Sequence, residues 1–201
     1  MAAEVEIWRP LLSLILASVV VMGSPGPSTM SMTAVGAAFG LRRSVGYLAG
    51  LVVGTTVVLL AVATGVVSIL LSVPRLAPAL LVASAAYMLY LAFRIATAPP
   101  LSKRDDATAP SFTGAFLLAV ANPKAYVAIA AVFAGTTIAA DALLDAILKT
   151  AILAGMIVVI HVCWLLAGAS FSRVFYDPVR SRIANIVFAA TLVVMTVFAF
   201  V

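Results

Sequence analysis

The sequence has 201 residues, of which 65% are hydrophobic and 9% are charged, and its mean hydropathy is +1.23. Soluble domains carry about a quarter charged residues, and a chain of this length has too small an interior to hide so much apolar surface from water. The composition therefore excludes an ordinary soluble enzyme or binding module and predicts an all-α integral membrane protein.

Uncharged windows divide the chain into six predicted membrane spans. Between Arg9 and Arg42 lie 32 residues without a formal charge, and between Arg43 and Arg75 lie 31. A helix needs about 20 apolar residues to cross the hydrocarbon core, so each window accommodates one span. In chain order, we expect transmembrane helices near residues 10–38, 45–71, 76–95, 113–139, 143–169 and 183–201.

The first predicted span contains the sequence Ser-Pro-Gly-Pro-Ser-Thr, in which Pro25 and Pro27 flank Gly26. Each proline removes a backbone donor and clashes with the preceding turn, so a continuous helix is not expected here. Pro27 suits the first position of a new half-helix, whose free amides at Ser28 and Thr29 would lie at the positive end of the helix dipole. A kink satisfied by neighbouring helices is the alternative, but two prolines around a glycine favour a functional break.

The fourth predicted span joins two short windows around Asn122, Pro123 and Lys124. Asparagine is a strong N-cap and proline a preferred first helical residue, so a second half-helix is expected to begin here. A charge near the bilayer centre costs about 2.5–3.5 kcal/mol and usually marks a substrate or ion path. Snorkelling to an interface is the alternative, but the nearest charged residues, Asp106 and Asp141, lie 18 and 17 positions away.

Two half-helix N-termini beside one lysine predict an anion site, and a carboxylate is its natural organic guest. His161 is the only histidine and lies in the fifth predicted span. It is a candidate for proton coupling because a free imidazole titrates near pH 6.5, although a histidine that merely packs through a hydrogen bond is the more common case. The single cysteine, Cys163, precludes an intrachain disulfide, and we expect neither a metal nor a cofactor.

The polar, proline-containing segment 97–112 predicts a cytoplasmic linker between two halves of one membrane domain, residues 1–96 and 113–201. Each half has a long window with proline at its centre, then a second span, then a closing run of 18 or 19 uncharged residues. Because three is an odd number, the second half must enter the membrane from the opposite side. This layout predicts two inverted three-helix repeats, with spans one and four broken near the midplane.

The net charge of +5 is explained by membrane topology and needs no nucleic-acid partner. The predicted loops after spans one, three and five hold eight basic residues: Arg42, Arg43, Arg94, Lys103, Arg104, Arg173, Arg180 and Arg182. The opposite side holds only Arg9, Arg75 and Lys149. The positive-inside rule then places those loops in the cytoplasm and both termini outside.

Three motifs together resemble the LysE/RhtB family of amino-acid exporters. They are Ser-Pro-Gly-Pro at 24–27, Gly-Leu-Arg-Arg-Ser-Val-Gly at 40–46, and Asn-Pro-Lys at 122–124, and the length and six hydrophobic segments match across essentially the whole chain. The resemblance implies a secondary transporter in the bacterial inner membrane, driven by the proton gradient, that exports small amino acids or their derivatives. It also implies a functional centre made of Pro25, Gly26, Pro27, Asn122, Pro123 and Lys124, without fixing the substrate.

Several alternatives stay open. An exporter or channel for another small solute or cation is one, although a cation path would need acidic residues at depth. An intramembrane serine protease is another, but Ser170 and His161 are nine residues apart, about 900° of helical rotation, and so face opposite ways. A purely structural subunit is disfavoured by the cost of burying Lys124. The sequence leaves homo-oligomerisation undecided.

Overall fold

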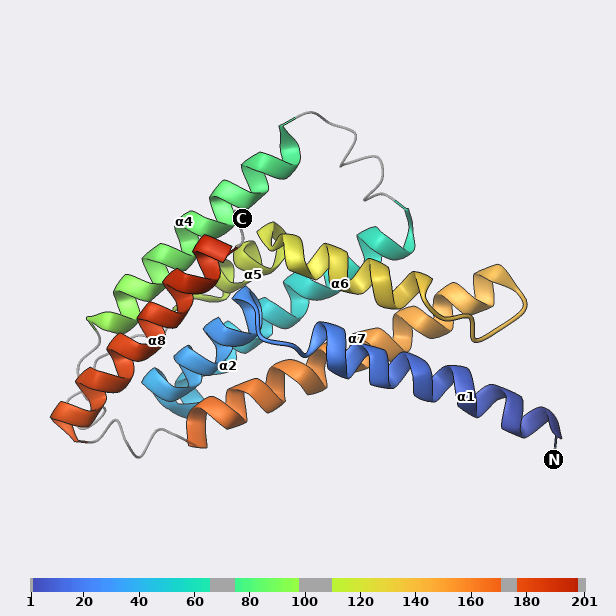
Figure 1. Cartoon of the computed structure of the whole chain (residues 1–201), viewed down its shortest axis with the longest axis horizontal. Coiled ribbons are helices and arrows are strands. Elements are labelled where there is room, and N and C mark those ends of the chain that lie inside the picture. The colour runs from blue at the N-terminus through green and yellow to red at the C-terminus, as the bar shows by residue number, and fades with distance from the viewer. Residues whose placement is uncertain (1, 66–74, 98–109, 171–176, 199–201) are drawn as a thin grey trace.

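The computed structural model describes residues 2–65, 75–97, 110–170 and 177–198, and these ranges contain helices and no β-strand (Figure 1). In chain order they form α1 (Ala2–Ala17), the π-helix η1 (Ser18–Met22), α2 (Pro27–Ala63), α4 (Leu76–Ala96), α5 (Phe112–Ala121), α6 (Pro123–Ala134), α7 (Ala142–Ser170) and α8 (Pro178–Phe198). The predicted all-α class is confirmed for this part of the chain. The end of the second predicted span and most of the predicted linker lie outside the described residues.

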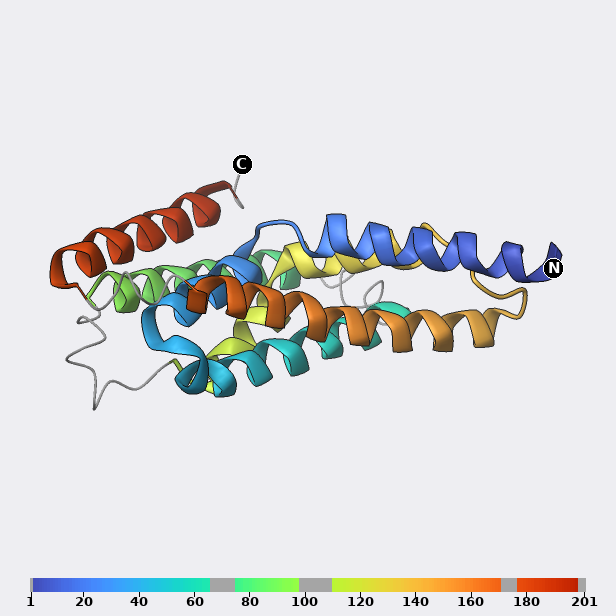
Figure 2. The ribbon, with the colours of Figure 1, turned by 90° about the horizontal axis from the view of Figure 1, so that it is seen from below.

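Helix α2 consists of two segments that meet at Gly40, where the chain reverses direction (Figures 1 and 2). Gly40 has a φ of 74°, a backbone conformation that glycine adopts readily and that is strained for residues with a side chain. The Ser44 hydroxyl donates to Gly40 O at 2.6 Å and lies 3.2 Å from Val35 O, which closes the end of the first segment. Because the reversal needs only one residue, Arg42 and Arg43 lie in helix and not in the predicted loop.

The second segment of α2 packs closely against α5. A Cβ added to Gly50 would lie 2.8 Å from the Cβ of Ala115, and one added to Gly54 would lie 2.8 Å from the Cβ of Ala119. Small residues at such positions let two helix backbones approach. The contact fixes α5, and with it the helix interruption at Asn122 that follows α5, against α2, which begins at the first helix interruption.

Helices α4 and α8 form a second packed pair, joined at one end by a hydrogen bond of 3.1 Å from Arg182 Nη1 to Ala96 O. The same end of the molecule holds the reversal in α2, the C-terminal ends of α4 and α7 and the N-terminal end of α8, while the N-terminus lies at the opposite end (Figure 1). Five arginines belong to the helix ends gathered there: Arg42, Arg43, Arg94, Arg180 and Arg182.

Two of the described helices, α2 and α7, are long and apolar enough to cross a membrane, and α5 with α6 would make a third span bent by 60°. Large apolar side chains face outward on several helices. Leu16, Val20, Val127 and Leu143 are 63%, 68%, 71% and 70% exposed. Apolar surface of this extent matches contact with lipid, as expected of a membrane protein.

Candidate functional site

The first helix break lies between η1, which ends at Met22, and α2, which begins at Pro27. Gly26 is the extended N-cap residue, and its amide donates to Thr29 Oγ1 at 2.9 Å. Met30 donates to Gly26 O at 2.9 Å, so the amides of Ser28 and Thr29 precede the first intrahelical bond of α2. The break therefore occurs where the two prolines predict it.

The carbonyl groups released at this break are met by side chains of other helices. Trp164 on α7 donates from Nε1 to Gly23 O at 3.1 Å. Burying a carbonyl without a donor is costly, so this bond helps to hold the end of η1 in place. The contact also brings α7, and with it His161 one turn earlier, against the break.

The second break lies at Asn122, which ends α5 and caps α6. Its side-chain oxygen accepts a hydrogen bond from the Lys124 amide at 3.1 Å, and Pro123 is the first residue of α6. The two helices are bent by 60° at this point. Asparagine and proline thus occupy the N-cap and first positions that the sequence predicts for them.

The two breaks meet, although about a hundred residues separate them. Lys124 Nζ donates to Ser24 O at 2.6 Å, to Ser24 Oγ at 2.8 Å and to Pro25 O at 2.8 Å. Asn122 Nδ2 donates to Ser28 Oγ at 2.9 Å. An ammonium group has three N–H donors, so these three oxygens occupy all of them.

Gly26 makes this approach possible. A Cβ at this position would lie 2.6 Å from Lys124 Cδ and 2.8 Å from Lys124 Nζ, closer than side chains pack. The lysine thus passes directly over the glycine to reach the first break. The predicted Pro-Gly-Pro and Asn-Pro-Lys motifs are one structural unit, with a cation held at the N-terminal ends of two helices.

A cavity of about 40 Å³ adjoins this unit and is lined by five of the predicted substrate-binding residues: Gly26, Ser28, Thr29, Asn122 and Lys124. A second cavity, of about 510 Å³, is lined by all three predicted prolines, Pro25, Pro27 and Pro123, together with Ser24. Gly26, Asn122, Lys124 and Ala128 line both cavities, so they form the wall between them.

His161 and Thr55 also line the smaller cavity, from α7 and α2 respectively. His161 is 4% exposed, and its Nδ1 lies 2.8 Å from Ile157 O. A carbonyl can only accept, so Nδ1 carries the proton in this contact and Nε2 is left as an acceptor. Thr55 was not singled out from the sequence, because its neighbour Thr56 has the same side chain in the same apolar window.

The alternative of a serine protease gains no support from the geometry. Ser170 is exposed at the C-terminal end of α7, and its hydroxyl donates to Leu166 O at 2.7 Å. His161 is buried at the cavity, nine residues earlier on the same helix. The two side chains are not brought together, as the helical rotation between them predicts.

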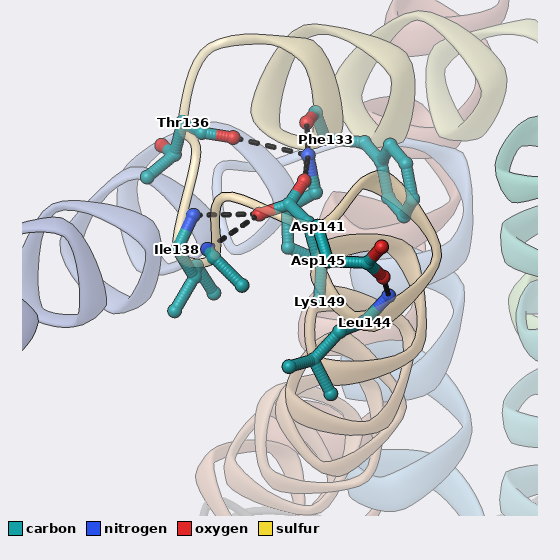
Figure 3. Close-up of polar contacts among 8 residues, drawn as sticks. Phe133, Thr136, Ile138, Asp141, Leu144, Asp145 and Lys149 are labelled. Atoms are coloured by element: carbon teal, nitrogen blue, oxygen red, sulfur yellow. Dashed lines mark hydrogen bonds and ion pairs between the residues drawn. The ribbon is translucent and has the colours of Figure 1, made fainter.

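A second lysine is buried where α6 connects to α7 (Figure 3). Lys149 Nζ lies 2.7 Å from an oxygen of Asp145 and donates to Phe133 O at 2.8 Å and Thr136 O at 3.0 Å. The other oxygen of Asp145 accepts hydrogen bonds from the backbone of Ile138 and Ala139 at 2.6 and 3.2 Å.

Lys149 and Asp145 both lie inside α7, within the predicted fifth span 143–169, and both are buried. The charge count of the sequence analysis gave Lys149 no partner, and the structure pairs it with Asp145. Both carboxylate oxygens are occupied by the lysine and the connecting backbone. Asp145 therefore closes a corner of the fold and does not line either cavity.

Comparison with known proteins places this unit in a family. The family model described as LysE type translocator matches residues 19–201, which include both helix breaks. The cysteine/O-acetylserine efflux proteins of Escherichia coli (strain K12) and Shigella sonnei (strain Ss046) are each 31% identical to the chain over 178 residues, 88% of this chain and 90% of each relative. The protein of that name in Salmonella typhi is 30% identical over the same length. No solved structure matches the chain. The chain belongs to the LysE type translocator family.

Proposed function

We propose that this protein is a secondary transporter that exports small amino acids or their derivatives across the bacterial inner membrane. The observation that carries the proposal is the junction of the two helix breaks, where Lys124 Nζ lies 2.6–2.8 Å from three oxygens of the first break. The relatives named for cysteine and O-acetylserine efflux support small neutral amino acids as the substrate class. The family membership supports transport over catalysis.

The substrate carboxylate binds at this junction. Lys124, the amides of Ser28 and Thr29, and the Asn122 side chain supply the donors, while Pro25, Gly26, Pro27 and Pro123 hold the backbone open. A carboxylate forms stronger hydrogen bonds with an ammonium than a carbonyl does. It therefore competes with Ser24 O and Pro25 O for Lys124 Nζ.

This competition links binding to movement. The smaller cavity, at about 40 Å³, has room for only about three water molecules and is too small for an amino acid. Releasing Lys124 from the first break removes the bonds that tie α6 to Ser24 and Pro25. We infer that the two breaks separate when substrate enters and rejoin when it leaves.

Six spans in two inverted repeats remain the architecture that we propose. Each half has a broken helical element, then a long helix, then a helix of 21 residues, α4 in one half and α8 in the other. Carriers built in this way place substrate where broken helices meet near the midplane.

The arginines gathered at one end of the molecule support a cytoplasmic location for that end and an external location for both termini. Cysteine labelling tests this orientation, in a Cys163→Ser background with new cysteines at Ala3 and Ala107. We expect a membrane-impermeant reagent to label position 3 in intact cells. Labelling of position 107 from outside would show that the orientation is wrong.

We further propose that the proton gradient drives export, with His161 at the cavity as the residue that takes up the proton. The test is efflux of radiolabelled L-cysteine, kept reduced, from preloaded vesicles containing the purified protein. Efflux should exceed that of empty vesicles and should rise severalfold with an inwardly directed proton gradient. Efflux equal to that of empty vesicles would contradict amino-acid export, and efflux indifferent to the gradient would contradict proton coupling.

A further inference from the structure

Besides Lys124 and the residues at the helix N-termini, two further polar side chains line the smaller cavity, Thr55 on α2 and His161 on α7. Both residues are more than nine-tenths buried, at 6% and 4% exposure. Among the described residues, neither Thr55 Oγ1 nor His161 Nε2 has a hydrogen-bond partner. Buried polar atoms without partners are uncommon in folded proteins, and each one asks for a ligand or another explanation.

The neighbouring threonine shows that this state of Thr55 is specific to its position. Thr56 Oγ1 donates to Val52 O at 2.8 Å, the usual local bond of a threonine in a helix. Thr56 does not line the cavity. The same helix thus carries one satisfied hydroxyl and, one residue away, one unsatisfied hydroxyl beside the cavity.

The tautomer of His161 defines what these two side chains can bind. Nδ1 is committed as a donor to Ile157 O, so Nε2 offers a lone pair. Thr55 Oγ1 also has lone pairs to offer. These two side chains can therefore accept hydrogen bonds, whereas Lys124 and the first amides of α2 can only donate them.

We propose that Thr55 and His161 bind the α-ammonium group of the exported amino acid while the helix breaks bind its carboxylate, an inference that rests on the proposed function. The ammonium nitrogen of an amino-acid zwitterion lies three bonds from its carboxylate oxygens, so one small substrate needs acceptors and donors close together, and the cavity lining supplies both once the two breaks separate. Lys124 is the only charged side chain that lines this cavity among the described residues, and it is one of the donors. A proton on Nε2 would occupy the same lone pair, so substrate and proton exclude one another at His161.

The test compares L-cysteine with N-acetyl-L-cysteine, which keeps the carboxylate and thiol but lacks the ammonium group. Efflux of both is measured from vesicles at matched protein abundance. We expect the parent to prefer L-cysteine by at least tenfold. Thr55→Val should lower L-cysteine efflux about tenfold to hundredfold, the loss expected for a hydrogen bond to a charged group, and leave the slow N-acetyl rate unchanged. His161→Phe also removes the proposed proton acceptor, so it should lower both rates but reduce the preference for L-cysteine over N-acetyl-L-cysteine.

Matched variants separate recognition from folding. Thr56→Val should export both compounds at the parental rate, and Thr55→Ser and His161→Gln, which keep an acceptor, should retain most of the preference. Variants that lose both compounds equally, or neither, would overturn the inference while parental export of cysteine upholds the proposed function. A parent that exports neither compound would contradict the proposed function itself.

Discussion

A lysine side chain lies at each end of helix α6, one from α6 itself and one from α7, and the two are held by different kinds of partner. Lys149 reaches the C-terminal end of α6, donates to Phe133 O and forms an ion pair of 2.7 Å with Asp145. Lys124 lies at the N-terminal end and is held by carbonyl and hydroxyl oxygens of the first break. The helix dipole favours a cation at a C-terminus and disfavours one at an N-terminus.

The different partners of Lys124 and Lys149 indicate where a substrate carboxylate can bind. The charge of Lys149 is neutralised within its own helix by a carboxylate four residues earlier, so nothing more is needed there. The charge of Lys124 is compensated by dipoles alone in the interactions that the structure shows, close to the positive ends of α2 and α6. An incoming carboxylate improves the surroundings of Lys124 and has no place at Lys149.

Removing the charge of Lys124 should give the largest effect on transport. We expect Lys124→Met to lower efflux at least about hundredfold, because losing the partner of a carboxylate costs about 3 kcal/mol. Membrane abundance should hold or rise, since the insertion penalty of about 2.5–3.5 kcal/mol disappears. Lys124→Arg should also export poorly, because a planar guanidinium does not replace a compact ammonium. Parental efflux by Lys124→Met at matched abundance would contradict the carboxylate site.

Removing the charge of Lys149 should instead lower stability. Lys149→Met leaves the Asp145 carboxylate buried without its partner, which costs about 3–5 kcal/mol. Thermal unfolding in detergent should show a clear drop, and Asp145→Asn combined with Lys149→Met should recover much of it. Efflux by the folded fraction should stay near the parental rate. A loss of efflux without a loss of stability would place this corner in the transport mechanism and abolish the contrast between the two lysines.

A smaller effect is expected from filling the space beneath Lys124. The Cβ of Gly26→Ala would meet Lys124 Cδ at 2.6 Å and displace the lysine, so we expect roughly tenfold lower efflux, about 1.4 kcal/mol. Gly46→Ala is the matched control, because no atom lies within 4 Å of its Cβ position. That variant should export normally and gain up to about 1 kcal/mol from helix propensity. Equal effects of the two substitutions would show that the lysine does not depend on Gly26.

Local chemistry explains why both helix breaks were predictable. Proline removes a backbone donor wherever it stands, and Asn-Pro provides an N-cap and a first helical residue within two positions. The helix boundaries at Pro27 and Asn122 follow from these residues alone. The reversal at Gly40 was not predicted in detail, because a glycine in an apolar window is compatible with both helix and turn.

The spacing of Asp145 and Lys149 was a usable signal that the charge count overlooked. Residues four apart lie on one face of a helix and can pair. The charge count assigned Lys149 to one side of the membrane without a partner, whereas the residue is 6% exposed and paired with Asp145. The six-span count, the inverted repeat and the roles of the site residues stay predictions.

The sequence by itself determined that this is a membrane protein of the all-α class. It also determined the two places where helices must break and the presence of a lysine at one of them. These depend on composition and on residues adjacent in the chain. Only the tertiary structure decided that Lys124 reaches Ser24 and that Thr55, not Thr56, lies beside the cavity with His161. Such contacts join segments up to a hundred residues apart, and which faces of the helices meet depends on the packing of whole helices and not on local preference.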